Sequence, residues 1–487
     1  MNVKSAALQG GLWFAALSLA TQGVSWVFTF YVIRLLDPSD YGLMTMASIL
    51  TAYLQMFSGL GLGAGIVQRE EVTDEELDAV FWLSLGVGSA LGALAVALAY
   101  PTSWIFHEPR VIPVTQLIGF LFFISGVSTV PYGILSRRLE LRKIAEANAI
   151  ATLVSSALSV YWAANGYGVY TLILTNLALN GLKTLLYFRA SRWLPRLRYS
   201  SNDVRPHLSY GMYLGLSSAS LRLFQQLDRL VVGRVFGALQ LGIYGNAMTV
   251  ASMPLDKIWP LYQQIAFPLF SRLQATRSEC FEAYLNLGKH YLVVMTPAYL
   301  GIMVVAPDLV QVALGAKWLP MVPLLQIFCG VKILEALTSY HAVLLNSIGH
   351  HREVFWFYLI LVVVIPASVL AFSLRSFAAV SIPWLLIYPI ICVAWLASSL
   401  VRIGIPLRKY RSVLFAGMRS SVLMAAVVTA VQFVRPVSAM PSGVQRLLIL
   451  ILIGVLSVSC ALFVWQRPLV REAFNALFVS RKRREIN

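Results

Sequence analysis

The sequence contains few charged residues. Asp, Glu, Lys and Arg make up 12% of its 487 residues, whereas 58% of the residues are hydrophobic. Soluble domains contain about a quarter charged residues, because charged side chains keep their surfaces hydrated. The scarcity of charge therefore excludes an ordinary soluble protein and predicts an integral membrane protein.

Groups that could support catalysis or hold a metal are also scarce. The four cysteines, Cys280, Cys329, Cys392 and Cys460, are too widely spaced for a metal motif or a disulfide framework. The six histidines are scattered, and no GxxxxGK[ST] nucleotide-binding loop is present. We therefore expect a protein that is not an enzyme and that binds no cofactor and no metal.

Long apolar runs dominate the chain. Runs of about 20 apolar residues recur along its whole length, which is the pattern of membrane-spanning helices. The alternation expected for barrel strands is absent, so the sequence predicts an all-α polytopic bundle of about fourteen helices. The expected spans are 11–33, 41–65, 79–99, 113–134, 146–163, 168–188, 209–233, 240–262, 290–306, 322–345, 355–373, 379–400, 413–433 and 444–466. The first span is too long for a signal peptide, so we expect it to be retained.

The positive charges follow a membrane topology. The net charge of +17 would suit nucleic-acid binding, but with a cytoplasmic N-terminus most Lys and Arg fall in the inner loops. The outer connections carry few of them, namely Arg34, Arg110, Arg234, Lys317, Arg375, Arg435 and Arg446. The positive-inside rule then predicts a multi-pass protein of the cytoplasmic membrane with both termini in the cytoplasm. We expect contact with anionic membrane lipids and no nucleic-acid partner.

The two halves of the chain resemble each other. Residues 32–36 (VIRLL) and 41–43 (YGL) match residues 232–236 (VGRVF) and 241–243 (LGI), about 200 residues later. An arginine and a glycine keep the same separation in both copies. The pattern predicts an internal repeat.

The repeat and the basic segments predict a domain organisation. A basic loop at 189–208 follows six expected helices, so both copies would enter the membrane with the same orientation. We predict an N-terminal six-helix lobe at 1–188, a cytoplasmic basic linker at 189–208 and a second six-helix lobe at 209–400. Residues 401–487 would add two further helices and a basic cytoplasmic tail.

Several charged residues are expected within the membrane, where each costs about 3 kcal/mol or more. Arg222 and Arg229 are seven residues apart and therefore share one face of the helix at 209–233. A hydrated cavity between the lobes that binds an anion would explain four cations: Arg222, Lys332, Arg229 and Lys257. The nearby acidic residues Asp228, Asp256 and Glu335 are candidates for ion pairing or ion coupling.

Internal ion pairs are the alternative explanation for these charges. Lys332 could pair with Glu335 one helical turn further on, and Arg229 could be held near Asp228. The sequence leaves both explanations open.

Several motifs identify a family resemblance. Residues 34–42 (RLLDPSDYG), 59–63 (GLGLG), 228–234 (DRLVVGR), 266–273 (AFPLFSRL) and 314–320 (LGAKWLP) stand in order along the chain. They resemble Wzx-type polysaccharide flippases, in particular the WzxC-like lipopolysaccharide and exopolysaccharide exporters of the MOP superfamily. The match covers nearly the whole chain.

The resemblance implies a function. It implies transfer of undecaprenyl-diphosphate-linked oligosaccharide repeat units across the cytoplasmic membrane, by alternating access of two lobes, alongside other polysaccharide assembly proteins. The intramembrane cations would then hold the diphosphate, since arginine and lysine both pair with phosphate oxygens. A multidrug or other lipid exporter of the same superfamily is an alternative, although a drug exporter would favour acidic residues. A membrane glycan polymerase or ligase is a further alternative, which normally carries a large outer loop that is missing from this sequence.

Overall fold

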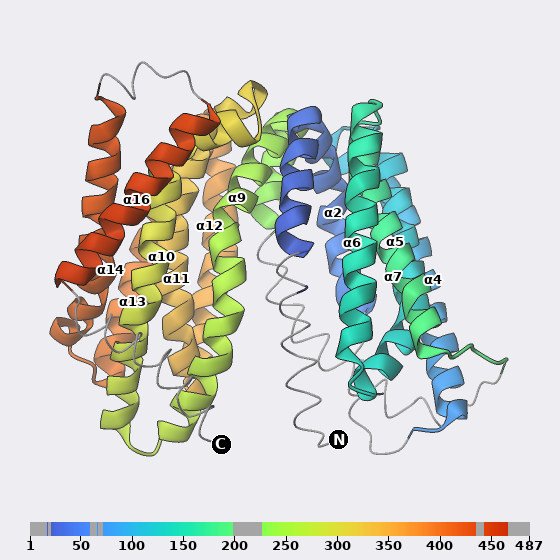
Figure 1. Ribbon diagram of the computed structural model, residues 1–487, viewed down its shortest axis with the longest axis horizontal. Helices are drawn as coiled ribbons and strands as arrows, with labels where there is room; N and C mark the ends of the chain where they lie inside the picture. Colours follow the sequence, from blue (N-terminus) through green and yellow to red (C-terminus); the bar gives the residue numbers. More distant parts are fainter. Residues whose placement is uncertain are drawn as a thin grey trace. The chain divides into compact units, whose positions relative to one another are not determined.

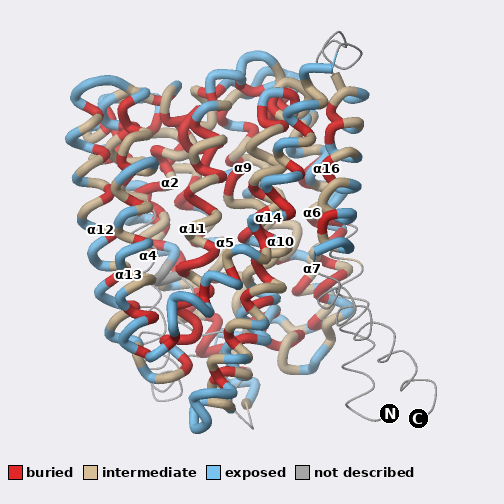
Figure 2. The backbone as a smooth tube through the Cα atoms, turned by 90° about the vertical axis from the view of Figure 1, so that its left-hand side faces the viewer, coloured by how far each residue is buried: buried red, intermediate tan, exposed pale blue. Residues whose placement is uncertain are grey.

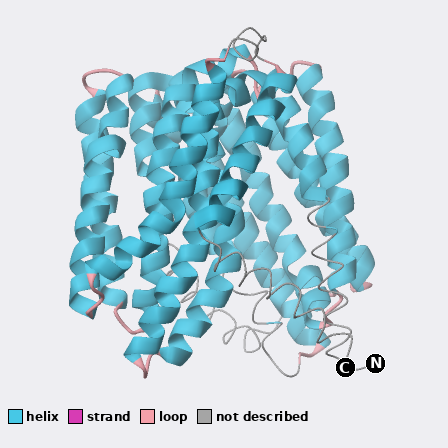
Figure 3. Cartoon of the chain, turned by 60° about the vertical axis from the view of Figure 1, so that its left-hand side comes forward, coloured by secondary structure: helices cyan, strands magenta, loops and turns pink. Residues whose placement is uncertain are grey.

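A computed structural model describes residues 17, 21–58, 66, 72–197, 226–434 and 443–465. Over these ranges the chain forms helices joined by short connections and contains no strand (Figure 3). Ten of the helices are long and apolar enough to cross a membrane. The protein is therefore an all-α, multi-pass membrane protein, as the sequence predicts. The count of fourteen and the two repeated lobes remain predictions.

The chain forms two compact units, residues 1–245 and residues 246–487. The helices of the first unit are residues 21–35, α2 (Pro38–Ser58), α4 (Asp74–Phe106), α5 (Val111–Arg137), α6 (Leu141–Ala164), α7 (Val169–Ser191) and the first part of α9 (Leu227–Leu273) (Figure 1). Only the start of the predicted linker at 189–208 lies within the described residues.

Local sequence signals define how these helices begin. Pro38 is the first residue of α2, where its missing N–H removes no helical hydrogen bond. Before α4, the Thr73 hydroxyl accepts a hydrogen bond from the Glu76 amide (3.2 Å), and the Glu76 carboxylate accepts one from the Thr73 amide (3.3 Å). This capping box satisfies two amides that the helix itself leaves unpaired.

Glycines allow α4 and α5 to pack closely. A Cβ atom added to Gly92 would lie 2.8 Å from the carbonyl oxygen of Gly119, and one added to Gly119 would lie 2.9 Å from the carbonyl oxygen of Gly92. Small residues bring helix backbones together in membranes, where lipid removes most of the hydrophobic drive for association. This seam therefore depends on both glycines.

The second unit contains the remaining helices. They are the rest of α9, α10 (Arg277–Ala313), the 3₁₀ turn η1 (Ala316–Met321), α11 (Val322–Ser347), α12 (His351–Ser373), the short turns η2 (Ala378–Ser381) and η3 (Pro383–Ile387), α13 (Tyr388–Ile403), α14 (Leu407–Gln432) and α16 (Val444–Trp465). Figure 2 shows exposed positions along α12, α13 and α16. Many of them are apolar, including Val363, Ile390 and Leu452, as expected for surfaces that face lipid.

The predicted interruption between the spans 209–233 and 240–262 is present, because two helices join within α9 at Gly237, whose φ of 78° and ψ of −174° are not helical. The ends of the neighbouring helices differ from the prediction. The helix then continues through Pro260 and Pro268 to Leu273, and α10 starts at Arg277, well before the predicted span at 290–306. Proline removes one helical hydrogen bond without ending a helix that tertiary packing supports.

Candidate functional site

One face of α9 in the second unit is exposed and mostly polar, and the apolar residues Leu261 and Ile265 are exposed beside it. It carries Asp256, Lys257, Gln263, Gln264 and Phe267, all of which are exposed. A helix repeats every 3.6 residues, so these positions lie along one side. The opposite side carries Leu255, Tyr262, Ala266 and Phe270, which are buried.

The composition of this face indicates contact with water. Charged and carboxamide side chains exposed to hydrocarbon are costly, and in membrane proteins they face cavities or protein. Consistently, α9 is not among the ten described helices that are apolar enough to span a membrane by composition. We therefore take the exposed face of α9 as the candidate functional site.

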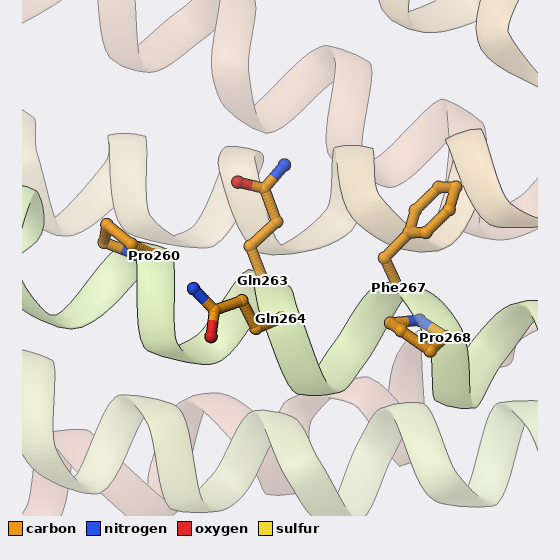
Figure 4. A pocket seen from close by; sticks show the side chains of 5 residues that line it. All are labelled: Pro260, Gln263, Gln264, Phe267 and Pro268. Atoms are coloured by element: carbon orange, nitrogen blue, oxygen red, sulfur yellow. The ribbon is translucent and has the colours of Figure 1, made fainter. Parts of the chain in front are cut away.

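A cavity of about 450 Å³ lies on this face and is lined by Pro260, Gln263, Gln264, Phe267 and Pro268. Gln263 and Phe267 project in the same direction from the helix (Figure 4). Carboxamides both donate and accept hydrogen bonds, and an aromatic ring offers a flat apolar surface beside them. In addition, the prolines have no N–H to donate to the carbonyls four residues earlier, which leaves those acceptors available.

An ion pair on α11 belongs to the same unit. Lys332 is 8% exposed, and its Nζ lies 2.7 Å from Glu335 Oε2. Asp256 is close enough to Lys332, Glu335 and Lys257 for electrostatic interaction. Four predicted site residues are thus brought together: Asp256, Lys257, Lys332 and Glu335. The ion pair named above as an alternative for Lys332 is present, and a bound anion would compete with Glu335 for this lysine.

The other predicted residues are not joined to this cluster. Asp228 and Arg229 belong to the first compact unit. Asp228 is 6% exposed and accepts a hydrogen bond from the Tyr244 hydroxyl at 2.7 Å. The Nε of Arg229 is buried and has no hydrogen-bond partner within the described part of the chain. Arg222 lies outside the described residues, so its predicted role stays a prediction.

Sequence reasoning did not select Gln263, Gln264 and Phe267. The expected span at 240–262 ends just before Gln263, so these three residues fall outside every expected span. The available signal was the pair of adjacent glutamines, which stands between apolar residues on both sides. Had the span been extended past them, they would have been selected, because polar side chains inside a membrane span usually have a functional or structural reason.

The fold is that of a polytopic helical membrane protein, and solved flippases and multidrug transporters share it. The structure is similar to that of the lipid II flippase MurJ in an inward closed conformation, with a TM-score of 0.68 and 13% identity over 94% of this chain and 100% of that chain. It is also similar to an inward-facing multidrug resistance MATE family transporter of the MOP superfamily, with a TM-score of 0.62 and 15% identity over 78% and 94% of the two chains. At these identities the likeness shows the fold.

Sequence comparison gives the family. The family described as polysaccharide biosynthesis protein matches residues 31–323, and the chain belongs to it. It is 27% identical to the lipopolysaccharide biosynthesis protein WzxC of Escherichia coli K12, over 69% of each chain. It is 24% identical to the succinoglycan biosynthesis transport protein ExoT of Rhizobium meliloti, over 80% of this chain and 78% of ExoT. The predicted resemblance to Wzx-type proteins of the MOP superfamily is confirmed.

Proposed function

We propose that this protein is a flippase that moves undecaprenyl-diphosphate-linked oligosaccharide repeat units from the cytoplasmic to the outer leaflet of the cytoplasmic membrane. The products would be used for exopolysaccharide, capsule or lipopolysaccharide biosynthesis. The observation that carries the proposal is the exposed polar face of α9, which carries Lys257, two glutamines and an aromatic ring. The names of the relatives, which include lipopolysaccharide biosynthesis and succinoglycan transport, support the class of substrate.

The chemistry of this face suits a charged lipid headgroup followed by sugars. A diphosphate needs cations to enter a region of low dielectric, and Lys257 together with Lys332 provides them. Sugar hydroxyls need neutral donors and acceptors, which Gln263 and Gln264 provide. Asp256 and Glu335 would keep the two lysines paired when no headgroup is bound. Alternating access would then carry the headgroup across.

The two carboxylates also support a second candidate function. An exporter of cationic drugs or of another lipid would use Asp256 and Glu335 as the substrate partners and the lysines as their counter-ions. The two functions depend on oppositely charged residues of the same cluster. Removing the cations should abolish the first function, whereas removing the carboxylates should abolish the second.

Complementation of glycan export in a strain that lacks the gene tests the proposal. We expect Lys257→Ala to lower export about tenfold or more, because a hydrogen bond to a charged group contributes about 1.5–3 kcal/mol. Because Lys332→Ala leaves Glu335 unpaired, the double variant Lys332→Ala/Glu335→Ala should accompany it. The matched control is Lys289→Ala, which removes a half-buried lysine of the same unit that lies on α10.

Export is normalised to the amount of folded protein in the membrane. Normal export by both Lys257→Ala and the double variant would contradict the diphosphate site on α9. Loss of resistance to cationic compounds in Asp256→Asn and Glu335→Gln, with export unchanged, would favour the exporter of cationic substrates instead.

A further inference from the structure

A second cavity, of about 460 Å³, lies in the first compact unit where three connections meet. The connections are the start of α2, the turn between α4 and α5, and the turn between α6 and α7. The residues that line it include Asp40, Arg110, Tyr167, Gly168 and Tyr170. The charge distribution of the sequence predicts all three connections on the outer side of the membrane.

Backbone geometry holds two tyrosines at the mouth of this cavity. Tyr167 is 46% exposed and Tyr170 is 39% exposed. Between them, Gly168 has a φ of 53°, and a Cβ atom at this position would lie 3.1 Å from Asp40 Oδ1. Only glycine combines this conformation with such close approach to the carboxylate. The turn therefore packs Gly168 against Asp40, and the tyrosines on either side of it line the same cavity as Asp40.

The charged groups at and beside the rim are one cation and two carboxylates. Arg110 donates two hydrogen bonds to Glu108, from Nε to Oε1 and from Nη2 to Oε2, both at 2.9 Å. Hydrogen bonding to Arg110 lowers the pKa of the Glu108 carboxyl, so this group stays ionised at neutral pH. Asp40 lies within electrostatic range of the same guanidinium. One cation between two carboxylates gives no net positive charge, so the cavity is not suited to a phosphate or another anion.

We propose that this cavity binds a neutral or N-acetylated sugar ring on the outer side of the membrane. Tyrosine faces carry negative charge density and contact the C–H faces of a sugar ring, whose hydrogens are slightly positive. The rim supplies carboxylate acceptors and a guanidinium donor for the hydroxyl groups. The inference rests on the proposed saccharide transport and locates where part of the glycan is held after it crosses the membrane.

Exposed tyrosines are also common at membrane interfaces, where they anchor helices without binding a ligand. The chain provides a matched control for that role. Tyr161 is 60% exposed, lies near the end of α6 before the same turn and does not line the cavity. An anchoring role predicts the same behaviour for Tyr161 and for the two tyrosines of the cavity, whereas a sugar site distinguishes them.

Saturation-transfer difference NMR on the full-length protein in nanodiscs tests the proposal, with cellobiose, maltose and N,N′-diacetylchitobiose as probes. We expect at least one disaccharide to bind, and Tyr167→Ala/Tyr170→Ala to weaken its binding about tenfold or more. Tyr167→Phe/Tyr170→Phe keeps both rings and should retain most of the binding. Tyr161→Ala should bind as the unmodified protein does, and each variant must show unchanged thermal stability.

These probes carry neither lipid nor diphosphate, so sugar binding is measured independently of transport. If the lysine variants of α9 export normally, the diphosphate site is overturned and this measurement is unaffected. Absence of binding for all three disaccharides, or an equal loss in Tyr161→Ala, would overturn the sugar site and leave the flippase proposal standing.

Discussion

Gly42 of α2 and Gly242 of α9 pack backbone against backbone within the first compact unit. A Cβ atom on Gly242 would lie 3.1 Å from the Gly42 amide nitrogen and would overlap the carbonyl of Pro38. A Cβ atom on Gly42 would overlap the carbonyl of Ala238. The two contacts are reciprocal, because Pro38 and Ala238 stand at the same distance in sequence before the two glycines. Both segments adjoin the residues in which the repeat is seen in the sequence.

The glycine contact leads to a prediction about packing. Gly42→Ala and Gly242→Ala should each destabilise the protein by about 1–3 kcal/mol, because the added methyl group meets backbone that cannot turn away. Gly245→Ala is the control, since a Cβ atom there meets only the Thr45 hydroxyl oxygen, at 3.6 Å. Thermal unfolding of the purified protein in detergent measures the effect. Equal stability of all three variants would show that the close contact between Gly42 and Gly242 does not contribute to the stability of the protein.

The same contact allows a test of alternating access. Because Gly245 faces Thr45, the double variant Thr45→Cys/Gly245→Cys should form a disulfide under mild oxidation. If transport requires α2 and α9 to separate, the crosslink should stop glycan export and reduction should restore it. Each single cysteine variant serves as the control. Full export by the crosslinked protein would contradict movement at this contact.

A partly buried ion pair joins α10 to α16. Arg446 Nε lies 3.2 Å from Asp308 Oδ1, and the Arg446 side chain is 21% exposed, whereas Asp308 is 5% exposed. Arg446→Leu should destabilise the protein by about 3–5 kcal/mol, because it leaves the buried Asp308 carboxylate without compensation. We expect Asp308→Leu/Arg446→Leu to recover much of the stability that Arg446→Leu alone loses. A double variant as unstable as the worse single variant would mean that the pair is not a coupled unit.

Membrane topology is open to direct measurement. Reporter fusions at Lys409 should report the cytoplasm, and fusions at Lys317 should report the outer side, because the positive charges concentrate in the loops expected inside. Alkaline phosphatase and green fluorescent protein, which are active on opposite sides, provide the paired readout. The reverse pattern would place the cavity lined by Tyr167 and Tyr170 in the cytoplasm, and the sugar site would then be wrong.

Much of the fold could be predicted from sequence, because each membrane-spanning helix makes its backbone hydrogen bonds within its own segment. A run of apolar residues long enough to cross the membrane must be helical, since its backbone has no other hydrogen-bond partners there. The expected spans 322–345 and 444–466 therefore agree closely with α11 (Val322–Ser347) and α16 (Val444–Trp465). The pairing of Lys332 with Glu335 could also be predicted from sequence, because side chains three residues apart lie next to each other on one helix.

Only the tertiary structure decided which helices bring their polar residues together. The sequence could not show that Asp256 of α9 lies within electrostatic range of Lys332 of α11, because the contact depends on how two helices pack. Nor could it show that α9 continues through Pro260 and Pro268, since packing by neighbouring helices outweighs the lost hydrogen bonds. The cavity beside Gly168 arises in the same way. Its residues come from three turns that are far apart in sequence, and they meet because the helices between those turns pack side by side.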